Sequence, residues 1–93
     1  MTATLPPLPA RLIHADADGF LQAALAYWRS QASATQWGID ASALEQFDSS
    51  VLAVLLGLRR ALLAQGATLN VHGLPPRLRG LATLYGVAEL LPA

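Results

Sequence analysis

The chain is 93 residues long, with 54% hydrophobic residues, 13% charged residues and a formal net charge of +0. The length fits one small domain, and we expect that domain to span residues 1–93. The balanced charge argues against the basic or acidic surfaces that bind nucleic acid or anionic membranes. So apolar a composition predicts either that a partner protein covers part of the surface, or that an Ala- and Leu-rich α/β core is tightly packed.

Membrane insertion and secretion are not indicated by the sequence. No uninterrupted run of about 20 apolar residues is present, as a membrane-spanning helix would require. The N-terminus lacks the basic start and apolar core of a secretory signal. Cysteine is absent, which excludes disulfides and thiol catalysis. We therefore expect a cytoplasmic protein without direct membrane insertion.

The first nine residues contain Pro6, Pro7 and Pro9. Proline is incompatible with a helix interior or a central strand. Residues 1–9 are therefore expected to run extended along the surface. The sequence of residues 10–15 predicts the first strand.

A helix is predicted over residues 17–31, with Asp16 or Asp18 as its cap. Apolar residues recur at helical spacing and are expected to face the core. They are Phe20, Leu21, Ala24, Leu25 and Trp28. A short strand, Gln36–Asp40, is predicted to follow.

The central element is a helix predicted from Asp48 to Gly66. Asp48 and Ser49 stand immediately before a long apolar run, where their side-chain oxygens can accept the free N–H groups of a first helical turn. Gly66 suits the left-handed conformation that ends many helices. Ser49 itself is interpreted either as a simple capping hydroxyl or as a functional position.

The two sides of this helix differ in composition. The apolar side carries Val51, Leu52, Leu55, Leu56, Leu58, Leu62 and Leu63. The other side, which we call the small-residue arc, carries Ser50, Ala53, Gly57, Arg60 and Ala64. A glycine inside a helix costs about 1 kcal/mol relative to alanine, and small residues let another backbone approach closely. Either a second helix of the same domain or a partner protein is expected to pack on this arc.

The remaining elements are a strand, Thr68–His72, and a helix over residues 77–84 with Pro76 at its start. Strands that alternate with helices predict an α/β fold with parallel pairing. In such sheets functional residues collect beyond the C-terminal ends of the strands. Asp40 and Ser49 are therefore expected at the same edge.

No catalytic or metal-binding constellation is found. His14 and His72 are isolated and have no Cys or Glu at ligand spacing, so no metal site is predicted. The chain has no lysine and therefore no phosphate-binding Gly–Lys–Ser loop. We expect neither a cofactor nor enzymatic activity.

Two stretches resemble a known family. The Asp-Ser-Ser start at residues 48–50, followed by Val-Leu-Ala-Val-Leu-Leu-Gly-Leu, is similar to the STAS domain, the fold of the anti-sigma-factor antagonists. The segments at 71–78, 81–87 and 90–92 resemble the small STAS subunits of Mla phospholipid-transport ABC systems. The resemblance covers residues 11–93.

This resemblance implies a small, mostly parallel central sheet with about three α-helices, and a non-catalytic protein. Ser49 matches the regulatory, often phosphorylatable hydroxyl of the family, with Asp40 as a supporting residue. The implied partner is the ABC transporter ATPase, which would hold the chain beside the inner membrane in a complex that maintains outer-membrane lipid asymmetry. Binding to an anti-sigma kinase is the alternative. The residues expected to contact the partner are Asp48, Ser49, Ser50, Ala53, Gly57 and Arg60.

One departure from the family concerns the start of the sheet. STAS domains usually begin with two strands, and only one fits before Asp16. The missing strand is expected either at residues 4–8, despite the prolines there, or not at all.

Overall fold

The computed structural model describes residues 2–31 and 34–91. In these residues the elements are β1 (Thr2–Thr4), β2 (Arg11–Leu12), α1 (His14–Ser30), β3 (Gln36–Asp40), β4 (Gln46–Phe47), α2 (Ser50–Ala64), β5 (Thr68–His72), α3 (Pro76–Leu84) and the short 3-10 helix η1 (Ala88–Leu90). The prediction of an α/β fold with a small parallel sheet and three α-helices is confirmed.

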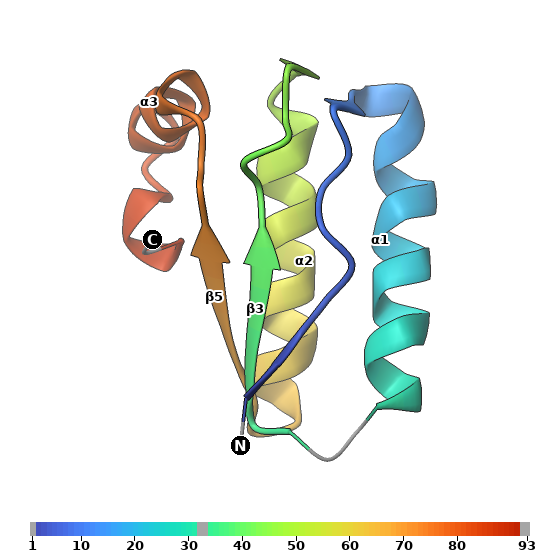
Figure 1. The fold of residues 1–93 in the computed structure, drawn as a ribbon. Coiled ribbons are helices and arrows are strands. Elements are labelled where there is room, and N and C mark those ends of the chain that lie inside the picture. Colours follow the sequence, from blue (N-terminus) through green and yellow to red (C-terminus); the bar gives the residue numbers. More distant parts are fainter. Residues whose placement is uncertain (1, 32–33, 92–93) are drawn as a thin grey trace.

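The main sheet has the order β1-β3-β5, and both pairs are parallel. Its register places Asp40, the last residue of β3, opposite His72, the last residue of β5. Helix α2 lies behind β3, α1 lies beside α2, and α3 lies on the other side next to β5 (Figure 1). Both α1 and α2 begin at the same end of the molecule, so their N-termini are neighbours.

The N-terminal segment differs from its prediction. The first strand is Thr2–Thr4 rather than residues 4–8, and it forms the edge of the main sheet. The chain then continues along β3, where the Leu5 N–H donates to the Gly38 carbonyl at 2.8 Å and the Leu8 N–H to the Asp40 carbonyl at 2.9 Å. Leu5 and Leu8 are buried in the core, so the prediction that this segment lies on the surface was wrong for these two residues.

The next segment is also shorter as a strand than predicted. Only Arg11 and Leu12 form β2, and α1 begins at His14. The helix starts early because the Asp16 carboxylate accepts the Ile13 N–H at 3.3 Å, which satisfies a free donor ahead of the first turn. Strand β2 pairs in parallel with β4, a two-residue strand that was not predicted.

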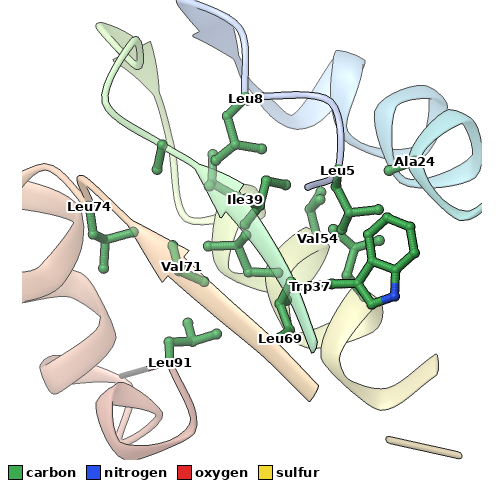
Figure 2. Packing of buried hydrophobic residues seen from close by; sticks show 14 of the residues in the cluster. Leu5, Leu8, Ala24, Trp37, Ile39, Val54, Leu69, Val71, Leu74 and Leu91 are labelled. Carbon is green, nitrogen blue, oxygen red and sulfur yellow. The ribbon is translucent and has the colours of Figure 1, made fainter. Parts of the chain in front are cut away.

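The hydrophobic core lies between the sheet and the two long helices. Trp37 and Ile39 of β3, Val71 of β5 and Leu5 point into it (Figure 2). From α2, Leu55 and four further residues of the predicted apolar side are buried: Val51, Leu52, Leu58 and Leu62. Burying one such side chain stabilises the fold by about 1.5–3 kcal/mol. The prediction of the apolar side fails at Leu63, which is 45% exposed.

The end of α2 confirms the prediction made for Gly66. This glycine has a φ of 77°, in the left-handed region. The turn is closed by the Ala67 N–H, which donates to the Leu62 carbonyl at 2.9 Å, and by the Gly66 N–H, which donates to the Leu63 carbonyl at 3.0 Å. These two hydrogen bonds form a Schellman motif that satisfies the carbonyls of Leu62 and Leu63 in the last turn.

Candidate interaction site at the start of α2

The carboxylate of Asp48 links the starts of the two long helices. It accepts the His14 N–H at 3.0 Å and the Ser50 N–H at 2.9 Å, and it also accepts the Ser50 hydroxyl. His14 is the first residue of α1 and Ser50 the first residue of α2. One side chain therefore satisfies a donor at the start of each helix, and Asp48 reaches the first of them, His14, across 34 positions of the sequence.

These hydrogen bonds act on the charge state of Asp48. The Ser50 hydroxyl is the largest cause that lowers the pKa of the Asp48 carboxyl, followed by the Ser50 N–H and the His14 N–H. The positive ends of two helix dipoles favour the carboxylate form in the same way. The Asp48 carboxylate thus connects the first turn of α1 to the first turn of α2.

Ser49 occupies the N-cap position of α2, but its side chain does not cap the helix. Its backbone is already helical, with φ −65° and ψ −13°, and its hydroxyl makes no capping hydrogen bond. The side chain is exposed. Capping by Asp48 thus leaves the Ser49 hydroxyl available at the surface.

An arginine of α3 reaches the same end of the molecule. The Arg77 guanidinium carbon lies 4.4 Å from the centre of the Phe47 ring, in a cation–π contact. Phe47 is the last residue of β4 and directly precedes Asp48. This contact was missed because no local pattern relates Phe47 to a residue 30 positions later in the sequence.

Asp40 belongs to a neighbouring cluster at the end of the sheet. Its carboxylate accepts the Ser42 N–H at 2.9 Å. The hydroxyl and N–H of Ser42 lower the pKa of the Asp40 carboxyl, and the nearby charge of His72 lowers it further. Asp40 and Ser49 were expected at the same edge of the sheet. In the chain, the unpredicted strand β4 lies between them, so α2 follows β4.

The small-residue arc of α2 is only partly open. A Cβ atom added to Gly57 would lie 3.3 Å from the Leu21 Cδ2 atom of α1. At Gly57, therefore, Leu21 of a second helix of the same domain packs on the arc, which is one of the two alternatives predicted for it. Ala53 and Arg60 of the same arc are exposed, and Ser50 is partly buried against Asp48.

The described part of the chain contains no group of three His, Asp or Glu residues that could hold a metal ion. Within residues 2–31 and 34–91, no helix is both long and apolar enough to cross a membrane.

Comparison with known proteins identifies the family. The family model described as "Mlab, STAS domain" matches residues 8–92. The chain therefore belongs to this family of STAS domains. A search of curated proteins gave no match. STAS domains in general mediate interactions between proteins, which is consistent with an exposed Ser49 hydroxyl at the junction of two helices.

Proposed function

We propose that this chain is the small, non-catalytic subunit that binds and regulates the cytoplasmic ATPase of an Mla-type ABC transporter. The transporter would move phospholipid between the membranes and preserve outer-membrane lipid asymmetry. The observation that carries this proposal is the match of residues 8–92 to the family model described as "Mlab, STAS domain". The location that follows is the cytoplasm, peripheral to the inner membrane through the ATPase.

The start of α2 supplies the surface for this contact in our proposal. Ser49 is exposed, and Ala53 lies exposed one turn further along the same helix. The junction at Asp48 fixes the position of both relative to α1, so little conformational freedom is lost when a partner binds. Ser49, Asp48, Ser50, Ala53 and Arg60 form the proposed contact, and Asp40 supports it from the sheet edge.

A second candidate is a phospho-switched antagonist that binds an anti-sigma serine kinase. The observation in its favour is that Ser49 is exposed and that its hydroxyl makes no capping hydrogen bond at a helix start. A phosphate at this position would lie near the positive end of the helix dipole, which favours a negative charge. The phosphate would also lie one residue from the Asp48 carboxylate, and the two negative charges would repel each other.

Affinity capture from native cells, followed by mass spectrometry, separates the two candidates. Recovery of an ABC ATPase supports the transporter subunit. Recovery of a GHKL-type kinase in its place would contradict it and support the phospho-switched antagonist. The non-catalytic role is tested by adding ATP or an ester to the purified chain, since turnover that Ser49→Ala removes would contradict it.

A further inference from the structure

A groove between the first turns of α1 and α2 lies directly beside the Asp48 junction. Its α1 side is lined by His14, Ala17 and Asp18, and its α2 side by Ser50, Ala53 and Val54. We call this hollow the α1–α2 groove. Ala17 on α1 and Ala53 on α2 have small side chains, so the two helices leave space between them here.

The groove is open to the surface and has a mainly apolar lining. Leu21, which also lines it, reaches over Gly57 and fills the space between the helices below. The volume is about 250 Å³, whereas pockets for small-molecule ligands usually enclose about 300–1,000 Å³. The dimensions suit a single large apolar side chain of a protein better than a whole small molecule.

The charged residues at the edge of the α1–α2 groove indicate which kind of molecule could bind there. Asp18 is exposed, and the one ion pair found in the described residues joins Arg11 to Asp16 instead. Asp48 lies next to the rim, since its carboxylate bonds both His14 and Ser50. The Asp48 carboxylate already accepts three hydrogen bonds, so Asp18 is the carboxylate of the groove that can meet a partner. It favours a basic protein segment and disfavours an anionic phospholipid.

We infer that the α1–α2 groove receives an apolar side chain from a segment of the partner protein that also carries an arginine or lysine facing Asp18. This inference rests on the proposed function and specifies the contact through which the ATPase is held. It adds His14 and Asp18 of α1 to a surface that otherwise lies on α2. The apolar side chain anchors the complex, and the basic residue orients it.

The test is a titration of the purified ATPase with the full chain and two groove variants. Ala53→Leu fills the groove, and Asp18→Lys reverses the charge on its rim. Each should raise the Kd about tenfold or more. The matched controls are Ala23→Leu, on the exposed side of α1, and Glu89→Lys, in η1, both of which should bind like the wild type. Thermal melts establish that each variant is folded, and Asp18→Asn tests the charge with little change in shape.

The results of this titration distinguish failure of the groove proposal from failure of the proposed function. If Ala53→Leu and Asp18→Lys bind as tightly as the wild type while Ser49→Asp loses binding, the groove is not the contact but the proposed function stands. If the wild type does not bind the ATPase, both the groove inference and the proposed function are wrong. Flotation with phosphatidylglycerol-containing vesicles covers the lipid alternative, because vesicle binding that Ala53→Leu removes would overturn the inference.

Discussion

At the scale of single residues, two neighbours at the start of α2 have separate roles. Asp48 makes the hydrogen bonds that hold the starts of α1 and α2 together, whereas Ser49 is exposed and makes no capping bond. Asp48 therefore stabilises this end of the fold in addition to lying in the proposed contact, whereas Ser49 is expected to act in the contact alone. Substitutions at the two positions should affect different properties.

We expect Ser49→Ala to change the free energy of unfolding by no more than about 0.5 kcal/mol, because the hydroxyl makes no capping hydrogen bond. Asp48→Ala should lower the melting temperature clearly more, since it leaves the donors of His14 and Ser50 without their acceptor. Thermal denaturation of the two variants checks this. Equal melting temperatures would show that the Asp48 junction contributes nothing to stability.

Stability should also depend on pH through Asp48 and Asp40. The pKa of each carboxyl is lowered in the folded protein, whereas in the unfolded chain it is near the ordinary aspartate value of about 3.9. Below that value the unfolded chain binds more protons, so stability is lost as the pH falls through the folded pKa. Unfolding in urea between pH 6 and pH 2 measures this. Asp48→Asn should reduce the loss of stability at low pH. An unchanged dependence of stability on pH in this variant would contradict the role given to Asp48.

At the scale of elements, the contact between α1 and α2 decides what the small-residue arc can accept. We expect Gly57→Leu to destabilise the fold by about 1–3 kcal/mol, because the new side chain collides with Leu21 in the interface. That cost exceeds the gain in helix propensity of about 0.5–1 kcal/mol. Ala53→Leu, on the exposed part of the arc, is the control and should leave stability unchanged. Equal stability of both variants would mean that α1 does not restrict the arc at Gly57.

Two other glycines, one at a helix end and one inside a helix, test the effect of backbone conformation separately from packing. A Cβ atom at Gly66 or at Gly80 would meet no other atom within 4 Å. Gly66→Ala should cost about 1 kcal/mol, because Gly66 has a left-handed backbone. Gly80→Ala should instead stabilise the protein by about 0.5–1 kcal/mol, since Gly80 lies inside α3. Chemical denaturation of both variants measures the change in the free energy of unfolding. A change of the same sign in both variants would contradict this prediction.

The long elements could be predicted from the sequence because their signals are local. The limits of α2 and the left-handed turn at Gly66 follow from capping residues and an apolar repeat within about 20 positions. Strand β4 escaped prediction, and β2 was predicted too long, because each has only two residues and is paired with the other. Strand β1 was misplaced because the prolines that follow it obscured a three-residue edge strand.

The candidate site could be predicted in part for the same reason. Asp48 and Ser49 stand out locally as helix-start residues, but the bond from Asp48 to His14 connects positions far apart in the chain. No local pattern could decide which of the two serves as the acceptor. The sequence likewise could not tell whether the space at Gly57 is filled by a helix of the same domain or by a partner.

At the scale of the whole molecule, the parallel sheet places several strand ends and helix starts at one end of the protein (Figure 1). Asp48, the exposed Ser49 and the contact between Arg77 and Phe47 all lie there. The opposite ends of α1 and α2 carry no comparable junction among the described residues. This asymmetry supports the start of α2 as the proposed contact with the ATPase.

The most direct test of the proposed function combines the affinity of Ser49→Asp for the purified ATPase with its melting temperature. A negative charge is tolerated at a helix start, so the melting temperature should stay close to that of the wild type. The same charge should weaken the complex, because an unpaired charge buried at an interface is costly. The account predicts that stability is kept and binding is lost. Ser49→Asp that binds the ATPase as tightly as the wild type would contradict it.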